Sequence, residues 1–284
     1  MEQRPQLETF WLHRIFGIDR QSSIATLAIV NMIFRGDGKN NINNDSCLNR
    51  GLVASTVDEK ASAKFVSRTQ ASKGTKAVTK VLMNPPFALK KGAEKEYKFI
   101  NHALDQMEDN GLLFSILPCS AMVKAGGYKT WRKELLKKNT LLSVITLPYD
   151  LFYPQSQPPP LAIIVKKGVK HPPNQNVLWI RVRTDGFRKV KHKRLRDNRI
   201  PDELDSVKGL VQNFVVNPNI SAPSIEEFQK ACPAVDFSDK DFELIPEAYI
   251  DAGIPSPDTI RQGVDENARE LIAFLIRSKK EDML

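Results

Sequence analysis

The sequence has few cysteines and no long apolar run, and these two shortages exclude several classes of protein. Its 284 residues include three cysteines, Cys47, Cys119 and Cys232. They are odd in number and too widely spaced for a zinc site, which fits a reducing compartment rather than a disulfide framework. No apolar stretch approaches the roughly 20 residues that cross a bilayer. The start, Met1-Glu2-Gln3-Arg4-Pro5, is unlike a signal peptide. We therefore expect a soluble cytoplasmic protein without a membrane segment.

Acidic residues are in the minority. The sequence has 42 Lys and Arg residues against 33 Asp and Glu, a formal net charge of +9. A basic surplus favours a polyanionic partner, nucleic acid first. A basic soluble protein without such a partner has the same surplus, so charge alone supports nucleic-acid binding only weakly. Hydrophobic residues make up 41% of the chain, which is enough for a proper core.

One stretch, residues 77–87, organises the chain. Its apolar run Val81-Leu82-Met83 stops abruptly at Asn84-Pro85-Pro86-Phe87. A short, partly β-branched run closed by two prolines predicts a buried strand. Proline has no N–H and a fixed φ, so the strand must stop at Asn84. In open α/β sheets, ligands bind at this carboxyl end of a strand.

The chemistry of these four residues suits an amine. The Asn84 side chain offers an oxygen acceptor, and the stiff backbone fixes the Pro85 carbonyl as a second one. Two converging acceptors match a group with two N–H donors, such as an exocyclic amine, and Phe87 can stack on the flat ring that carries it. The alternative is a strand-end turn in which the prolines only break the strand.

The remaining chain alternates helices and strands, which is typical of an α/β fold. Residues 54–77 predict an exposed, mobile loop, residues 217–236 a linker, and Asp109-Asn110-Gly111 a helix stop. We expect strands over residues 11–19, near Ile42, and over 112–118, 141–148 and 161–167, and helices over 21–35, from Tyr97 to Met107, over 131–139 and over 265–279.

Asp19 would end the first strand, directly before a helix. An acid in that place can accept both hydroxyls of a ribose. The alternative is an acid near a helix start, where the helix dipole favours it.

These motifs together resemble a known family. Asn84-Pro85-Pro86-Phe87 is similar to the (Asn/Asp/Ser)-Pro-Pro-(Tyr/Phe) motif of amino-methylating DNA methyltransferases. The flanking segments resemble the modification subunit of type I restriction-modification systems and occur in the family's order. They are Phe16-Gly17-Ile18-Asp19 with Leu27-Ala28 and Asn31-Met32, Asp45-Ser46, residues 112–118, the Leu-Pro-x-x-x-Phe segment 147–152, Asp185-Gly186-Phe187, and residues 246–250.

The resemblance implies roles for particular residues. Asn84 and the Pro85 carbonyl would position the amino group of an adenine flipped out of double-stranded DNA, and Phe87 and Phe152 would stack on the base. The methyl donor would be S-adenosylmethionine, with Asp19 at its ribose and Asp45 beside its adenine, and no metal is needed. Asp45 as a plain polar loop residue and Phe152 as a core residue remain the alternatives. Specificity and other restriction-modification subunits would be partners.

The densest positive run lies in residues 181–199. Such runs are usually solvated faces, but the net charge and the resemblance together favour phosphate contact. The candidates for DNA binding are Arg188, Lys189, Lys191, Lys193 and Arg194.

Two family features are not matched. Pro158-Pro159-Pro160-Leu161 replaces the usual Thr-Ser-Ile, which stiffens the loop before a strand. The family's donor-binding glycine loop should precede His13, yet residues 1–10 contain no glycine. We therefore expect an incomplete Rossmann-like class I methyltransferase sheet, lacking its first strand and glycine loop, with a carboxyl-terminal helical or irregular extension. Without the central strand, two sheet pieces would keep unpaired edges.

The expected organisation has three parts. Residues 1–170 would form the partial catalytic domain, 171–216 its basic continuation, and 217–284 a linker with a helical segment. Another chain would then complete the donor site. The main alternative is a non-catalytic remnant that binds DNA or subunits, and a weaker one is methylation of RNA or a protein amide.

Overall fold

The computed structural model describes residues 14–35, 41–55, 63–87, 92–154, 158–191, 193–218 and 229–250, with scattered residues between 257 and 268. By their internal contacts, Met1–Tyr249 form one unit and Ile250–Leu284 a second. Residues 1–10, residues 88–91 and most of the helix expected over 265–279 lie outside the described residues. Among the described residues, no helix is long and apolar enough to cross a membrane.

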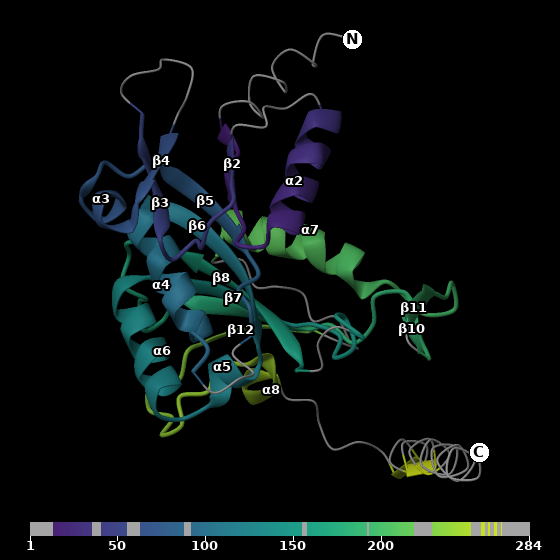
Figure 1. Cartoon of the computed structure of the whole chain (residues 1–284). Coiled ribbons are helices and arrows are strands. Elements are labelled where there is room, and N and C mark those ends of the chain that lie inside the picture. The colour runs from purple at the N-terminus through teal and green to yellow at the C-terminus, as the bar shows by residue number, and fades with distance from the viewer. Residues whose placement is uncertain are drawn as a thin grey trace. The chain divides into compact units, whose positions relative to one another are not determined.

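A six-stranded mixed sheet forms the centre of the first unit (Figure 1). Its strand order is β12-β9-β7-β8-β6-β5. The mixed α/β architecture expected from the sequence is confirmed. The strands are β5 (Val78–Met83), β6 (Met107–Pro118), β7 (Thr140–Thr146), β8 (Pro160–Lys166), β9 (Asn176–Arg181) and β12 (Gln229–Ala234).

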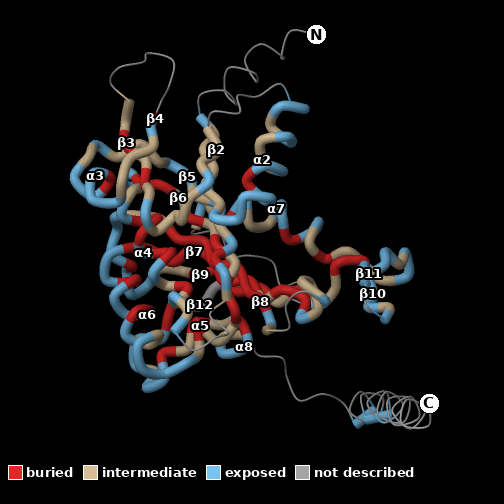
Figure 2. The backbone as a smooth tube through the Cα atoms, viewed as in Figure 1, coloured by how far each residue is buried: buried red, intermediate tan, exposed pale blue. Residues whose placement is uncertain are grey.

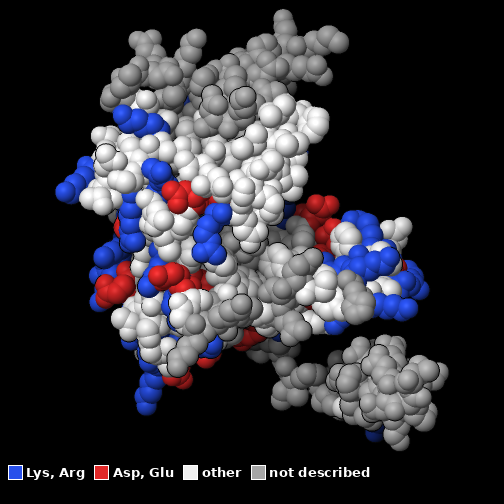
Figure 3. Space-filling view, viewed as in Figure 1, with Lys and Arg blue, Asp and Glu red and all other residues white. Residues whose placement is uncertain are grey.

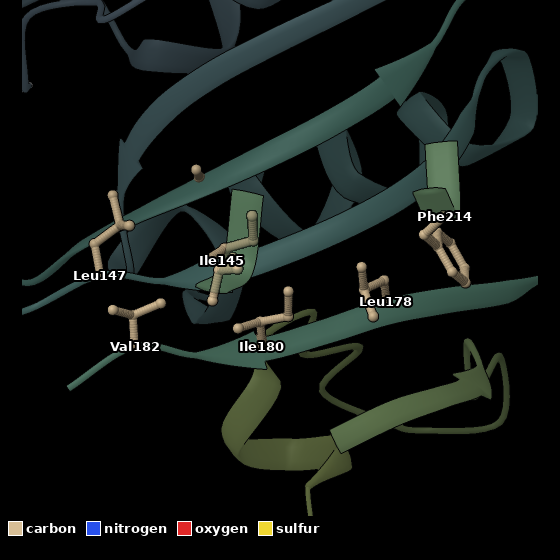
Figure 4. Close-up of a cluster of buried hydrophobic side chains, with 8 residues drawn as sticks. Ile145, Leu147, Leu178, Ile180, Val182 and Phe214 are labelled. Atoms are coloured by element: carbon tan, nitrogen blue, oxygen red, sulfur yellow. The ribbon is translucent and has the colours of Figure 1, made fainter. Parts of the chain in front are cut away.

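The middle of this sheet is buried on both faces (Figure 2). β7 and β8 read as nearly continuous apolar runs, which is typical of strands covered on both sides. On one face Ile145, Leu178 and Ile180 pack with Val207 and Phe214 of helix α7 (Glu203–Val216) (Figure 4). Trp179 alternates with Leu178 and Ile180, so it points to the opposite face.

That opposite face is covered by the short helix α8 (Pro246–Tyr249). The Trp179 indole stacks on the Tyr249 ring at a centroid distance of 3.8 Å and an interplanar angle of 5°. Residues 246–249, part of the segment 246–250 that resembles the family, therefore pack against the sheet.

Helices α4 (Glu96–Gln106) and α6 (Gly127–Lys138) pack together through aromatic rings. Tyr97 stacks on Trp131 at 5.9 Å, and the Trp131 indole N–H donates to Asn101 Oδ1 at 3.1 Å. The short helix α5 (Ser120–Val123) joins β6 to α6. These helices contact β6 and β7 and so contribute to covering the sheet.

The amino-terminal part forms separate small sheets. β1 (Gly17–Ile18) pairs in parallel with β2 (Ile42–Asn43), and α2 (Ser22–Phe34) connects them, as expected for 21–35. β3 (Arg50–Ala54) and β4 (Ala63–Ser67) form an antiparallel hairpin. The Leu52 N–H donates to Gln106 Oε1 at 2.9 Å, which ties this hairpin to α4.

The loop expected over residues 54–77 is wrong where the structure describes it. β4 occupies part of it, and α3 (Arg68–Lys73) follows directly. Ser67 and Gln70 form a reciprocal capping box at the start of α3, which compensates for a segment with few large apolar residues. The loop was predicted from amino-acid composition alone, which does not reveal a capping box.

Three further expectations need correction. The helix α4 ends at Gln106 rather than at Asp109-Asn110-Gly111, because β6 already begins at the buried Met107. β5 is not buried: it is the edge strand of the described sheet, and Leu82 is 84% exposed. The expected linker 217–236 contains β12, which pairs antiparallel with β9.

We predict that Arg132 of α6 holds residues 241–242, ahead of α8, in place. Its fully buried guanidinium donates to five backbone carbonyls, those of Ala121, Val123, Lys124, Asp241 and Phe242. Arg132→Met would leave these acceptors unpaired and should lower the free energy of unfolding by about 3 kcal/mol in urea titration. Lys137→Met, on the exposed face of α6, is the control and should change it by less than about 0.5 kcal/mol.

We also predict a pH dependence of stability from His171. The imidazole is 1% exposed, and burial lowers its pKa to about 4. The unfolded chain, with a pKa near 6.5, therefore binds the proton more readily, so stability falls as pH drops from about 6.5 to about 4, by on the order of 3 kcal/mol. His171→Asn keeps an acceptor for the Leu141 N–H.

In urea titrations at pH 7 and pH 4.5, wild type should therefore lose more stability on acidification than His171→Asn. Equal losses in the two proteins would show that His171 is not the group that titrates.

Candidate active site

The carboxyl ends of four strands meet at one end of the six-stranded sheet. β5 runs parallel to β6, and β7 runs parallel to β9. Both β6 and β7 run antiparallel to β8, so all four point the same way. Their last residues are Met83, Pro118, Thr146 and Arg181. This is the end at which open α/β sheets bind ligands.

Asn84 leaves the sheet at this end. The predicted stop is confirmed, since β5 ends at Met83. Pro85 is buried, Asn84 and Pro86 are exposed, and Phe87 is half-buried. Within the described part of the chain, no hydrogen bond occupies the Asn84 amide. Its side-chain oxygen is therefore open to a ligand at the sheet end.

The two aromatic rings that the sequence assigns to base stacking lie together. Phe87 follows β5, whereas Phe152 follows β7, and strands β6 and β8 lie between these two strands in the sheet. Their ring centroids are 6.3 Å apart, and the rings meet edge to face at 81°. This geometry is a favoured one for aromatic pairs. Both side chains are half-buried, so part of each ring faces outward.

The two predicted donor-binding acids form a second pair. Asp19 follows β1 and Asp45 follows β2, and the Asn44 amide donates to the Asp19 carbonyl at 2.9 Å. Asp19 Oδ1 accepts the Gln21 N–H at 2.7 Å, ahead of α2. The two carboxylates therefore stand at the ends of adjacent parallel strands.

Asp45 is held more firmly than Asp19. Arg50 Nε donates to its Oδ2 at 2.8 Å, and the Ser46 N–H donates to its Oδ1 at 2.7 Å. The side-chain bond from Arg50, followed by that from Ser46, lowers the pKa of Asp45. The group is thus a fixed carboxylate acceptor.

The structure does not join this acid pair to Asn84. In the described ranges, the β1–β2 pair shares no strand pairing with the sheet that ends in β5, and no hydrogen bond or ion pair links either acid to Asn84. A cavity of about 300 Å³ lies between Leu48 and helix α4, and its lining contains none of the predicted site residues.

The basic run forms a hairpin, β10 (Phe187–Val190) with β11 (Lys193–Arg196). Lys and Arg side chains gather over these two strands (Figure 3). Arg188 pairs with Asp197 at 3.0 Å, and the Lys189 ammonium lies 4.1 Å above the Tyr153 ring. Lys191 and Lys193 are exposed and, among the described residues, have no acidic partner.

Arg194 differs from the other candidates for DNA binding, because its guanidinium is turned inward. It contacts Asp185 at 2.6 and 2.8 Å and Asp150 at 3.4 Å. The hydrogen bonds to Asp185 raise the pKa of Arg194. Only 11% of its side chain is exposed, so it has little surface left for a phosphate.

Sequence reasoning assigned no role to Asp150 or Tyr153. Asp150 accepts from Arg194, and the Tyr153 hydroxyl donates to the Lys191 carbonyl. Both residues flank the Phe152 position, which is the only local signal that could have drawn attention to them. Their partners are far along the chain, so no periodicity in the sequence reports the contacts.

The chain is similar to proteins of restriction-modification systems. The family model described as N-6 DNA Methylase matches residues 6–254. A curated relative, the type II restriction enzyme and methyltransferase RM.BcgI of Heyndrickxia coagulans, is 35% identical over 185 residues, which is 63% of this chain. The chain spans only 26% of that relative's length.

Solved structures show the same fold. A chain from a type I restriction-modification system superposes with a TM-score of 0.62 at 17% identity. The superposition covers 98% of this chain and 55% of that chain. The type I methyltransferase subunit from Streptococcus thermophilus gives a TM-score of 0.51 at 22% identity and covers 75% of this chain and 43% of its own. The chain thus corresponds to about half the length of each.

Proposed function

Because the chain belongs to the N-6 DNA methylase family, whose members are DNA adenine methyltransferases, we propose that it carries the target-adenine half of such an enzyme. The reaction would move a methyl group from S-adenosylmethionine to the exocyclic amino group of adenine in double-stranded DNA. The setting would be a restriction-modification system, as in the similar proteins.

One observation carries this proposal: the Asn84 amide and the Phe87–Phe152 ring pair lie at the same end of the sheet. An unengaged amide oxygen at a strand end offers an acceptor for an N–H group, and the Pro85 carbonyl offers a second. Two aromatic rings beside them can hold a flat heterocycle by stacking. Hydrogen bonds to the base edge together with aromatic stacking are how enzymes hold a flipped base.

The chain's own groups would contribute by positioning and electrostatics. The Asn84 and Pro85 oxygens would accept both amine hydrogens, which would shift the nitrogen from a planar, ring-conjugated state towards a tetrahedral, nucleophilic one. The half-buried rings of Phe87 and Phe152 would exclude water from one side of the base. Asn84 would therefore act on the amine without forming a covalent bond to it.

The acid pair fits the nucleoside end of the methyl donor in its chemistry. Asp19 Oδ1 is engaged by one N–H, which leaves Oδ2 as an acceptor for ribose hydroxyls. Asp45, fixed by Arg50 and Ser46, would contact the donor's adenine. When bound, S-adenosylmethionine supplies a methyl group on a sulfonium, which is already a good leaving group.

The free edge of β5 is a place where a further strand could pair. In the described sheet β5 pairs only with β6, and Leu82 is 84% exposed. The β1–β2 pair stands apart from it. A long exposed edge is a template for another strand. We propose that another polypeptide segment, carrying a glycine loop, pairs here and completes the donor site.

Double-stranded DNA and other restriction-modification subunits, a specificity subunit among them, would be the remaining partners. The exposed lysines of the β10–β11 hairpin are the proposed phosphate contacts. A second candidate function is a non-catalytic DNA- or subunit-binding chain. The open β5 edge and the separation of the acid pair from Asn84 favour that alternative.

We predict that Asn84→Ala abolishes methyl transfer. The measurement is transfer of labelled methyl from S-adenosylmethionine to unmethylated DNA, with the chain alone and with an added amino-terminal fragment that carries the glycine loop. The variant removes one of the two acceptors for the amine, and loss of one preorganised group of this kind costs about 100- to 1,000-fold. Asn174→Ala, at an exposed turn, is the matched control and should retain full activity.

Activity that needs the fragment and is lost in Asn84→Ala is the expected result. Activity of the chain alone would show that no further strand is required. Equal turnover of Asn84→Ala and wild type would exclude the proposed site. No transfer under either condition would favour the non-catalytic alternative.

A further inference from the structure

Arg194, one residue pair from the turn of the basic hairpin, fastens the hairpin to the loop that carries Phe152. Arg194 in β11 contacts Asp185 through both terminal nitrogens and reaches Asp150 from Nε and Nη2. The side chains of Arg194, Asp185 and Asp150 are 11%, 6% and 15% exposed. Ion pairs this sheltered from water are screened less than surface pairs, so this one constrains geometry.

A second tether joins the tip of the hairpin to the same loop. The Tyr153 hydroxyl donates to the backbone carbonyl of Lys191, and the Lys189 ammonium lies over the Tyr153 ring. Asp150 and Tyr153, the first and last residues of the segment 150–153, therefore both bind the hairpin. Phe152 lies between them.

Apart from these tethers, the loop is held by Leu151, which packs partly buried against the hydrophobic cluster beneath α7. Its described backbone hydrogen bonds are local ones, from Leu151 to the Pro148 carbonyl and from Tyr153 to the Asp150 carbonyl. The Phe152 ring contacts Phe87 at 6.3 Å. Contacts therefore run without a break from the hairpin through Tyr153 and Phe152 to the residue that follows Pro86.

The charges on the hairpin divide into two kinds. Arg194 is inward and paired, whereas Lys191 and Lys193 are exposed and, in the described part of the chain, have no acidic partner. Arg188 and Arg199 both pair with Asp197. The exposed lysines thus lie at the turn and directly beside it, whereas Arg194, the next residue along β11, is turned inward.

We propose that the β10–β11 hairpin binds DNA phosphates through Lys191 and Lys193 and sets the position of Phe152 through Arg194 and Tyr153. This inference rests on the proposed function. Arg194 and Tyr153 are then positioning residues rather than DNA contacts. DNA bound at the turn holds the hairpin, and the hairpin in turn holds the loop against Phe87.

The test measures two properties of the full chain with a short unmethylated DNA duplex. The first is the salt dependence of DNA affinity, by fluorescence anisotropy. The second is amide hydrogen exchange of residues 149–153 with and without DNA, by mass spectrometry. Neither measurement requires methyl transfer, so the result is independent of whether the chain is catalytic.

The variants separate contact from positioning. Lys191→Ala and Lys193→Ala should each reduce the slope of log affinity against log salt by about 0.9, the effect of one lost phosphate contact. Tyr153→Phe removes only the hydroxyl that reaches the Lys191 carbonyl. It and Arg194→Leu should keep the wild-type slope but lose the DNA-induced protection of residues 149–153. Arg194→Lys should restore part of that protection.

Arg196→Leu is the matched control, because Arg196 lies in the same strand, is 61% exposed and pairs with Asp202 only at 3.9 Å. Arg196→Leu should keep the DNA-induced protection of residues 149–153, whether or not the slope of log affinity against log salt changes. A slope reduced by about one in Arg194→Leu would make Arg194 a phosphate contact and overturn the inference. Wild-type loop protection in Tyr153→Phe would overturn it too, and so would unchanged slopes in both lysine variants.

Discussion

Two adjacent prolines set the geometry on which the candidate site depends. Pro85 and Pro86 cannot continue a strand, so β5 ends at Met83 and Asn84 stands at the end of the sheet. Because β5, β6, β7 and β9 run in the same direction, this end also receives the segment after β7 that carries Phe152. The stop after β5 and the order of the strands together create the Phe87–Phe152 contact.

At the same end of the sheet, a sheltered group of ion pairs links three segments of the chain. Arg194, Asp185 and Asp150 bring together the hairpin, the segment after β9 and the segment after β7. A pair of this kind adds little net stability over apolar packing, but removing one partner leaves an uncompensated charge. Its value here is that it defines one relative position of hairpin and loop.

Much of the fold could be predicted from local patterns. The apolar runs of β7 and β8 gave their strands directly, and α2 lies within the helix expected over residues 21–35. β4 and α3 were missed because a capping box and a half-buried Phe65 make that segment ordered despite its polar composition. β12 was missed because it forms by pairing with β9, which is distant in the sequence, and its own residues show no strand pattern.

The sequence by itself determined the family and the chemistry of the Asn84-Pro85-Pro86-Phe87 segment, since these depend on residue types at fixed spacing. Only the tertiary structure decided which positive charges are free. Arg194 and Lys193 are neighbours in one basic run, yet Arg194 faces two acids while Lys193 faces solvent. A strand sends alternate side chains to opposite faces, and what lies on each face is supplied by distant segments.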